Sequence, residues 1–454
     1  MNQKKVILIG VFAILILIIF ITVLSKFMFQ TKSQKLTGTV MKYEDNMVTV
    51  QDQNLGIYTF RVKDVDFDIG DHIVIEYSGV LDRNHDHQDC KVQNYKLASK
   101  TDENGIPIEW KDSSIFHDYY NQAYQKLKTL TLEEKIGQLL LVRYPDFNQI
   151  EILKKYHLGG FVFYEKDFKN KTENEVIHMI ETLQGVADIP LLTAVDEEGG
   201  KVIRVSSNPN LVKVPFQSPS ELYKSGGFSK IKEDTIQKSR ILYHLGLNLN
   251  LAPVVDVSTD PSDYIYERTL QQNSSLTETY AKTVIEASKD TGVSYTLKHF
   301  PGYGNNTDTH TGVSVDNRSY QEILDHDLPP FQAGINAQAE AILVSHNIVN
   351  SIDNTNPASL SVSVHNLLRN ELKFSGIVIT DDISMSAVNN IDDISVKAIL
   401  AGNDLIITTD YEESFNEIKN AVKDGTISEE QINKLAFKIL SWKYYKLLLT
   451  DNLK

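Results

Sequence analysis

Eight short apolar runs, rich in β-branched and aromatic residues, alternate with longer stretches of helical pattern in the C-terminal two thirds of the chain. Runs of this length and composition predict buried strands, and strands that alternate with helices predict a parallel sheet. Eight such units predict an α/β fold of the (β/α)8 TIM-barrel type. The predicted strands are residues 138–142, 159–164, 191–195, 247–252, 294–297, 341–344, 376–380 and 404–408.

Polar residues stand at the ends of four of these predicted strands. They are Asp196 after the third strand, Lys298 and His299 at the end of the fifth, Ser345 and His346 at the end of the sixth, and Asp381 and Asp382 at the end of the seventh. The carboxyl ends of the strands of a barrel share one mouth, where the catalytic groups of such enzymes lie. A single Asp in this position is as readily a helix N-cap, but four converging strand ends favour an active site.

Residues 298–310, KHFPGYGNNTDTH, combine a Lys-His pair, a glycine-rich turn and an Asp-x-His pair. An imidazole titrates near neutral pH, so His310 suits general acid/base catalysis. Asp308 can accept a hydrogen bond from one ring nitrogen of His310, which fixes the tautomer and stabilises the imidazolium. The alternative is a turn aspartate beside a solvated histidine. Gly302 and Gly304 predict a loop that can close over a substrate and open again.

Five segments resemble, in order, the signatures of glycoside hydrolase family 3, and among its branches they are most similar to the β-N-acetylhexosaminidases. The segments are residues 196–204 (DEEGGKVIR), 251–257 (LAPVVDV), 298–310, 357–361 (PASLS) and 379–385 (ITDDISM). The resemblance covers about residues 130 to 449, which is the whole predicted barrel and nothing before it.

The resemblance implies a role for individual residues. Asp381, rather than its neighbour Asp382, matches the family's nucleophile, and His310 with Asp308 matches the acid/base pair of this branch. The positions that hold the hydroxyls and the acetamido group of the sugar fall on Asp196, Arg204, Arg268, Lys298 and His299. The sequence departs from the family's pattern after Arg268, where Thr-Leu replaces Ser-Phe, and at Tyr303, which replaces a histidine.

The function that the resemblance implies is an exo-acting, retaining β-N-acetylglucosaminidase. It would release terminal β-linked N-acetylglucosamine through a covalent glycosyl-Asp381 intermediate, with peptidoglycan fragments as the expected source and no metal or organic cofactor. A retaining glycosidase needs one carboxylate as nucleophile and a second group that gives and then takes a proton, which Asp381 and His310 provide. The alternatives are a phosphorylase of the same glycosides, another family 3 β-glycosidase, and a surface protein that binds glycans or acts as a scaffold without catalysis.

Residues 6–24 are apolar apart from Gly10 and Thr22, and as a helix they are long enough to cross a hydrocarbon core of about 30 Å. We predict that residues 1–28 form a cytoplasmic tail and an uncleaved transmembrane signal-anchor, with the catalytic domain on the outer face of the cell membrane. A cleaved signal peptide is the alternative. Basic residues flank both ends of the run, so their count leaves the orientation open. The single cysteine, Cys90, is too far away to be a lipid anchor beside this run.

Residues 35–100 contain short alternating apolar and polar runs separated by turn residues, which predicts a small antiparallel β-barrel of the oligonucleotide/oligosaccharide-binding (OB) type. A loop of this region carries possible metal ligands, but they lack the spacing of a structural zinc site, and a solvated loop is favoured. These residues are His85, Asp86, His87, Asp89 and Cys90.

Residues 101–118 are predicted to be a linker and residues 119–454 the catalytic domain. Thr131 and Glu134 have the spacing of a capping box, which predicts a helix start just before the first strand. The net charge of −15 provides no basic surface for a nucleic acid.

Overall fold

The computed structural model describes residues 33–52, 56–63, 65, 67–79, 81, 90–304, 312–446 and 448–449. The chain divides into two compact units between Asp112 and Ser113, within the predicted linker. In the described ranges, no helix has both the length and the apolar character that a membrane span requires. The predicted anchor, residues 6–24, lies outside those ranges, as do four of the five possible metal ligands at residues 85–89.

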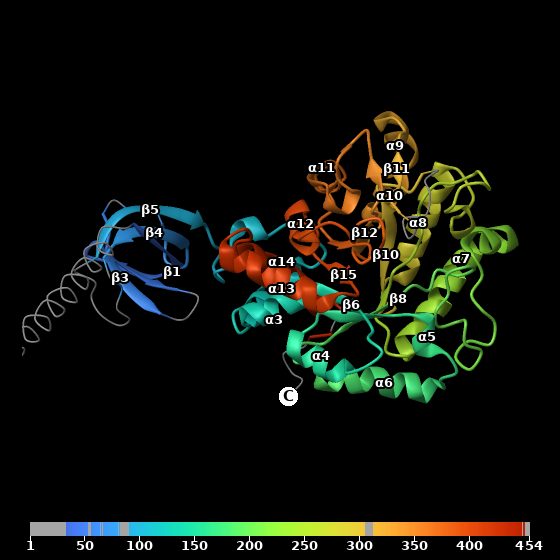
Figure 1. The fold of residues 1–454 in the computed structure, drawn as a ribbon, viewed down its shortest axis with the longest axis horizontal. Helices are drawn as coiled ribbons and strands as arrows, with labels where there is room; N and C mark the ends of the chain where they lie inside the picture. Colours follow the sequence, from blue (N-terminus) through green and yellow to red (C-terminus); the bar gives the residue numbers. More distant parts are fainter. Residues whose placement is uncertain are drawn as a thin grey trace, which may run out of the picture. The chain divides into compact units, whose positions relative to one another are not determined.

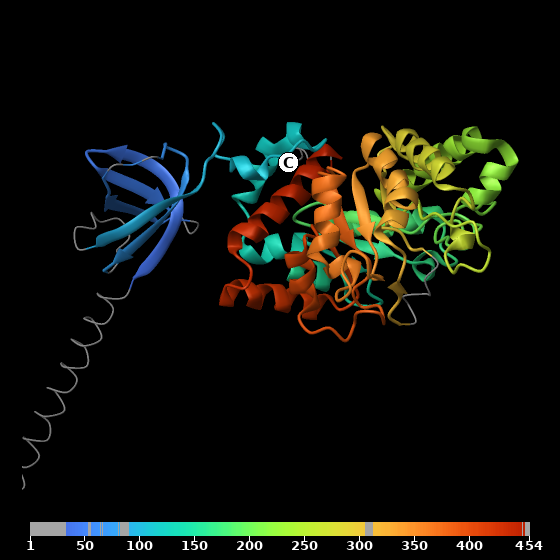
Figure 2. The ribbon, with the colours of Figure 1, turned by 90° about the horizontal axis from the view of Figure 1, so that it is seen from above.

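The described part of the N-terminal unit contains an antiparallel sheet (Figure 2). Its five strands have the order β3-β2-β1-β4-β5. The strands are β1 Gln34–Glu44, β2 Met47–Gln51, β3 Ile57–Arg61, β4 His72–Ser78 and β5 Lys91–Ser99. Asp45 and Asn46 connect β1 to β2 with φ angles of 52° and 62°, the left-handed conformation that a two-residue hairpin turn needs. Alternate residues such as Ile73 and Ile75 are fully buried, so one face of the sheet forms the core of this unit.

The C-terminal unit contains, in its described residues, a parallel sheet of eight strands in the order β14-β12-β10-β9-β8-β7-β6-β15. A bridge between Ile379 and Leu405 brings the two edge strands together, so that the sheet nearly closes into a barrel. The strands are β6 Leu140–Arg143, β7 Gly160–Phe163, β8 Leu192–Val195, β9 Leu249–Asn250, β10 Ser294–Phe300, β12 Ala341–Val344, β14 Ile377–Thr380 and β15 Ile406–Thr408. The prediction of eight parallel strands is therefore confirmed.

Helices surround the strands of this unit (Figure 1). They are α2 Tyr120–Leu127, α3 Leu132–Gln138, α4 Gln149–Tyr156, α5 Glu165–Phe168, α6 Glu173–Val186, α7 Pro219–His244, α8 Ser274–Ser288, α9 Tyr320–His326, α10 Leu328–Asn336, α11 Val362–Asn366, α12 Ile394–Ala401, α13 Tyr411–Asp424 and α14 Glu429–Tyr445. A short pair, β11 Val315–Asp316 and β13 Ile348–Val349, lies apart from the barrel sheet.

Local sequence explains the elements that could be predicted. All four residues of β14, Ile-Val-Ile-Thr, are buried, because a barrel strand has the core on one side and helices on the other. The capping box before α3 is present: Thr131 Oγ1 accepts from the backbone N–H of Glu134, and the Glu134 carboxylate accepts from the backbone N–H of Thr131 at 2.7 Å. This helix therefore begins where the sequence predicts.

Strand β10 is longer than predicted, since it continues to Phe300 rather than ending at Leu297. Lys298 and His299 therefore lie inside the strand and not after it. Backbone hydrogen bonds on both sides of Lys298, from its N–H to the carbonyl of Pro253 and from the N–H of Val255 to its carbonyl, continue the pairing. Two polar residues mark a strand end in a sequence, but here buried carboxylates satisfy both side chains.

A buried lysine lies at the amino ends of the barrel strands. Lys443 of α14 is fully buried, and its Nζ donates to Gln138 Oε1 at 2.6 Å and to the carbonyl of Gly159 at 3.0 Å. Gln138 and Gly159 precede β6 and β7, so one ammonium group joins two strand starts to α14. Both acceptors are neutral, and burial lowers the pKa of Lys443 from 10.5 to about 7.

This lysine makes stability depend on pH. A lysine with a lower pKa in the folded state binds fewer protons than in the unfolded chain between the two pKa values, so its contribution to the free energy of unfolding rises from pH 7 toward pH 10. We expect Lys443→Met to have a smaller rise in Tm between pH 7 and pH 9 than the wild type. Lys434→Met, an exposed substitution on the same helix, is the control and keeps the wild-type slope. Equal slopes in all three proteins would contradict the prediction.

Candidate active site

Lys298 lies in the polar mouth of the barrel. Its Nζ donates to Asp196 Oδ1 at 2.7 Å and lies 2.7 Å from Glu198 Oε1. Asp196 and Glu198 follow β8, so these contacts join the carboxyl ends of β8 and β10. Burial by itself lowers the pKa of Lys298, but the two carboxylates outweigh burial and raise it. The mouth therefore contains a permanently charged ammonium group.

Arg268 forms a bidentate ion pair with Glu198. Its Nε and Nη2 donate to Oε2 and Oε1 of Glu198 at 3.0 and 2.7 Å. Burial alone raises the pKa of Glu198, but Arg268 and Lys298 hold it far below its usual value. The sequence prediction included Arg268 and omitted Glu198, which stands two residues after Asp196 and shares its strand end.

The His299 ring lies between the Asp256 carboxylate and the Arg268 guanidinium. Its Nδ1 donates to Asp256 Oδ2 at 2.8 Å, and its Nε2 lies 3.3 Å from Nη2 of Arg268. A guanidinium can only donate, so Nε2 must accept and Nδ1 must carry the proton. Asp256 also accepts from the backbone N–H of Tyr303 at 2.7 Å and is 1% exposed. Asp256 thus fixes the tautomer of His299, a role that the sequence prediction did not assign.

The two neighbouring aspartates after β14 have different environments. The Asp381 carboxylate accepts from the backbone N–H of Asp382 at 2.9 Å. Burial alone raises the pKa of Asp381, but the His346 and His299 side chains, the Asp382 N–H and the Lys298 ammonium hold it below its usual value. The Asp382 carboxylate accepts from the backbone N–H of Ser384 at 2.9 Å, and burial and the charge of Asp381 raise its pKa. The Asp381 carboxyl group is therefore the more readily ionised of the two, and the Asp382 carboxylate stabilises the turn through Ser384.

Tyr164, directly after β7, extends the site to another strand end. Its ring faces the guanidinium groups of Arg143 and Arg204, with the carbon of each 4.6 and 5.5 Å from the ring centroid. Burial raises the pKa of its hydroxyl, and the charges of Asp196, Asp382 and Asp381 raise it further. The hydroxyl therefore stays protonated among the carboxylates of the mouth. The sequence prediction missed both residues, although Tyr164 ends the second predicted strand and Arg143 directly follows the first.

Arg204 is placed by its own backbone. Its N–H donates to Glu197 Oε2 at 2.8 Å, as does the N–H of Val205 at 2.7 Å, and Glu197 is fully buried. The Nε of Arg204 is a buried donor with no hydrogen-bond partner in the described part of the chain. Such a donor is costly unless an acceptor reaches it, so Arg204 is suited to bind a ligand oxygen.

His346 has a structural role, because both of its ring nitrogens contact protein atoms. It is fully buried, its Nδ1 lies 2.7 Å from the hydroxyl of Ser359, and its Nε2 donates to the backbone carbonyl of Asp382 at 3.0 Å. The backbone N–H of Ser345 donates to the carbonyl of Phe300. Both strand-end residues therefore connect β12 to its neighbours.

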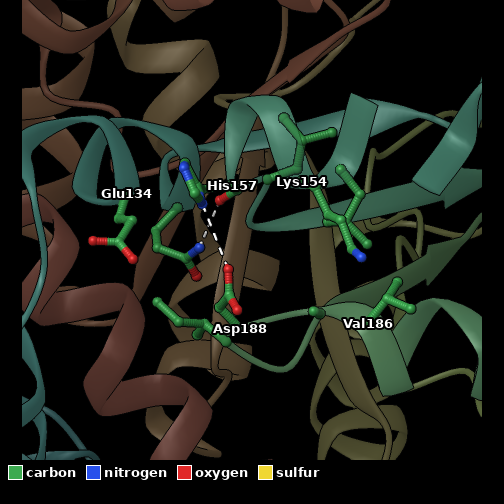
Figure 3. A pocket seen from close by; sticks show the side chains of 10 residues that line it. Glu134, Lys154, His157, Val186 and Asp188 are labelled. Carbon is green, nitrogen blue, oxygen red and sulfur yellow. Dashed lines mark hydrogen bonds and ion pairs between the residues drawn. The ribbon is translucent and has the colours of Figure 1, made fainter. Parts of the chain in front are cut away.

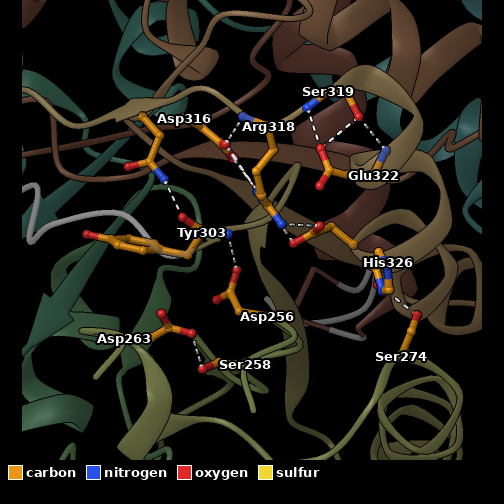
Figure 4. Close-up of polar contacts among 12 residues, drawn as sticks. Asp256, Ser258, Asp263, Ser274, Tyr303, Asp316, Arg318, Ser319, Glu322 and His326 are labelled. Carbon is orange, nitrogen blue, oxygen red and sulfur yellow. Dashed lines mark hydrogen bonds and ion pairs between the residues drawn. The ribbon is translucent and has the colours of Figure 1, made fainter. Parts of the chain in front are cut away.

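The segment that begins the predicted catalytic loop packs on a buried ion cluster (Figure 4). Arg318 donates to Asp316 Oδ2 at 2.7 Å and to Asp327 Oδ2 at 2.7 Å. Gly302 and Gly304 have φ angles of 132° and 62°, and a Cβ at either position would collide with Asp327 or Arg318, respectively. Only glycine fits both positions. Asp308 and His310, the predicted acid/base pair, lie outside the described residues.

Charged and polar side chains thus gather at the carboxyl-end mouth of an eight-stranded α/β barrel in the described chain, which is the architecture of a (β/α)8-barrel enzyme. Residues 131–442 match the family model described as the glycosyl hydrolase family 3 N-terminal domain. The chain belongs to this family and is a glycosidase.

Named relatives agree with this family. The β-hexosaminidase LpqI of Mycobacterium tuberculosis is 26% identical over 331 residues, which are 69% of this chain and 83% of LpqI. A β-hexosaminidase of Xylella fastidiosa is 29% identical over 282 residues, which are 60% of this chain and 82% of that enzyme. A family 3 β-N-acetylglucosaminidase from Paenibacillus superposes with a TM-score of 0.66 at 27% identity, and the match covers 71% of this chain and 65% of the Paenibacillus chain.

Asp256→Asn tests the link between Asp256 and His299. An amide in place of the carboxylate weakens the hydrogen bond that fixes the His299 tautomer, and the loss of one buried partner costs roughly 1–3 kcal/mol. We expect kcat/KM for an aryl glycoside substrate to fall about 10- to 100-fold, since a tenfold change corresponds to about 1.4 kcal/mol. Asp263→Asn serves as the control, because the Asp263 carboxylate accepts a hydrogen bond from the Ser258 hydroxyl at 2.7 Å and does not contact His299. Similar losses in the two variants would contradict a specific role for Asp256.

Proposed function

We propose that the chain is an exo-acting, retaining β-N-acetylglucosaminidase with Asp381 as its nucleophile. The observation that carries the proposal is the environment of Asp381, an ionised carboxylate at the end of β14 beside the Lys298 cluster. The names of the relatives, β-hexosaminidases and a β-N-acetylglucosaminidase, support the choice of sugar.

The mechanism is a double displacement. A carboxylate oxygen of Asp381 attacks the anomeric carbon while the bond to the leaving oxygen breaks, and His310 gives that oxygen its proton. Water then attacks the glycosyl-Asp381 ester, His310 takes a proton from the water, and the carboxylate leaves. Two inversions give a product with the original β configuration. Asp308 holds the His310 ring and stabilises its charged form between the two steps.

The remaining groups of the mouth hold the sugar. Lys298 and the Nε of Arg204 donate to sugar oxygens, and Asp196 accepts from hydroxyls. Arg268 and His299 complete the substrate site that the family resemblance assigns. The ion pairs of Lys298 and Arg268 fix these donors before the substrate arrives, so little reorganisation is needed during the reaction.

The N-terminal part of the chain adds two further proposals. The strand order β3-β2-β1-β4-β5 suits a barrel of the OB type, in which the first strand pairs with the second and the fourth. Residues 6–24 anchor the chain in the cell membrane, and the catalytic (β/α)8 barrel acts at the outer face of that membrane. Peptidoglycan fragments are the natural substrate. Protease accessibility on intact cells tests this placement.

The full chain should hydrolyse aryl β-N-acetylglucosaminide and not aryl β-glucoside, at a rate that does not depend on phosphate. Asp381→Ala should lower kcat by on the order of 10³-fold or more, because the covalent intermediate can no longer form. Azide added to this variant should occupy the space of the carboxylate and yield an α-linked glycosyl azide. Phosphate-dependent turnover would show phosphorolysis instead, and a variant Asp381→Ala with near wild-type kcat would exclude Asp381 as the nucleophile.

His310→Ala should affect substrates according to their leaving group. A leaving group such as dinitrophenolate departs without a proton, so its kcat/KM should change little, whereas an N-acetylglucosamine disaccharide should lose about 10²- to 10⁴-fold. The control is His326→Ala, at the exposed last residue of α9, which leaves kcat/KM for both substrates unchanged. Equal losses with both leaving groups would rule out the acid/base role of His310.

A further inference from the structure

Glu134, His157 and Asp188 meet beside a small cavity at the amino ends of the barrel strands (Figure 3). Glu134 lies on α3 before β6, His157 directly follows α4 and precedes β7, and Asp188 lies between α6 and β8. Each residue precedes its strand, so the cluster lies at the end of the barrel opposite the mouth that contains Lys298. One ligand atom from each of the three side chains lies within 4.8 Å of the other two.

His157 provides the clearest sign of a missing partner. Its Nδ1 is buried and has no hydrogen-bond partner in the ranges that the structure describes. Asp188 Oδ2 lies 3.7 Å from this nitrogen, which is beyond hydrogen-bond distance. The backbone of His157 is anchored, since its carbonyl accepts from Gln138 Nε2 at 2.8 Å. The His157 side chain is 29% exposed, but its Nδ1 is buried, and a buried polar atom without a partner is costly, so this nitrogen favours a ligand.

The two carboxylates are suited to supply the remaining protein ligands. Glu134 uses Oε2 to cap α3 through Thr131, and a carboxylate has a second oxygen available for a ligand. Asp188 is largely exposed and can turn toward the cavity. The cavity has a volume of about 10 Å³, which is the space of one water molecule or one metal ion.

We propose that Glu134, His157 and Asp188 bind one Zn²⁺ ion, with solvent as the fourth ligand. One imidazole nitrogen with carboxylate oxygens is a donor set that zinc accepts, and its metal–ligand distances are about 2.0–2.2 Å. Ligands of a tetrahedral ion are then about 3.4 Å apart. The 3.7 Å between Nδ1 of His157 and Oδ2 of Asp188 is close to that spacing.

The ion has a structural role, because it ties together the segments that lead into β6, β7 and β8. It does not take part in the reaction at the opposite mouth. The competing arrangement has no metal: His157 is protonated and forms an ion pair with the two carboxylates. The two arrangements differ in what the protein binds, so a binding measurement separates them.

The test uses the full chain after treatment with a chelator, titrated with Zn²⁺ by calorimetry and with Co²⁺ by visible absorption. We expect one equivalent of Zn²⁺ to bind and to raise the Tm. His157→Asn and Asp188→Asn should each weaken binding at least tenfold and remove the Tm increase. Asn tolerates the left-handed backbone of His157, with a φ of 50°, and Asp188 is exposed, so both variants are expected to fold.

His178→Asn, an exposed histidine on α6, is the matched control and keeps full Zn²⁺ binding. Aryl glycoside turnover should be the same in the chelated and the Zn²⁺-loaded protein, so failure of the proposed glycosidase activity and failure of the zinc site are distinguishable. No uptake of Zn²⁺, or uptake that Asp188→Asn and His157→Asn leave unchanged, would overturn the proposal.

Discussion

The mouth of the barrel depends on the ammonium group of Lys298, which two carboxylates share. Lys298 and Arg268 are positive, and Asp196 and Glu198 are negative, so this buried cluster is neutral as a whole. Burying charges is tolerated only when they are paired, and here each charge has a partner from another segment of the chain. Asp381 has no ion pair within 4.0 Å in the described part of the chain. Its carboxylate is therefore not paired with a cation of the neighbouring cluster.

The barrel was predictable from the sequence because parallel strands are buried on both sides and therefore appear as continuous apolar runs. Asp196, Lys298, His299 and Arg268 were identified from strand ends and from the family resemblance, and the structure brings these four residues together. The predicted end of β10 was wrong, because a sequence does not show that a buried carboxylate pairs with the Lys298 ammonium group inside the strand. Asp308 and His310 remain predictions.

Other parts of the site could not be predicted, because their roles arise from contacts between distant segments. Glu198 becomes a partner of Arg268 across 70 positions of sequence, and Asp256 meets His299 across 43. In the sequence, Tyr164 resembles any other residue of an apolar strand. Only the structure shows its ring beside Arg143 and Arg204. A carboxylate in a loop and a tyrosine at a strand end are too common in sequences to reveal which residues will face them.

The packing of Gly302 and Gly304 on the Arg318 cluster has a consequence for protein engineering. A side chain at either glycine would have to displace Asp327 or Arg318, so randomising these two positions to widen substrate range would mainly yield unfolded proteins. Val313 and Val315, on the far side of the loop, are 58% and 40% exposed and carry no such constraint. Variation confined to these two exposed positions therefore leaves the contacts of Gly302 with Asp327 and of Gly304 with Arg318 unchanged.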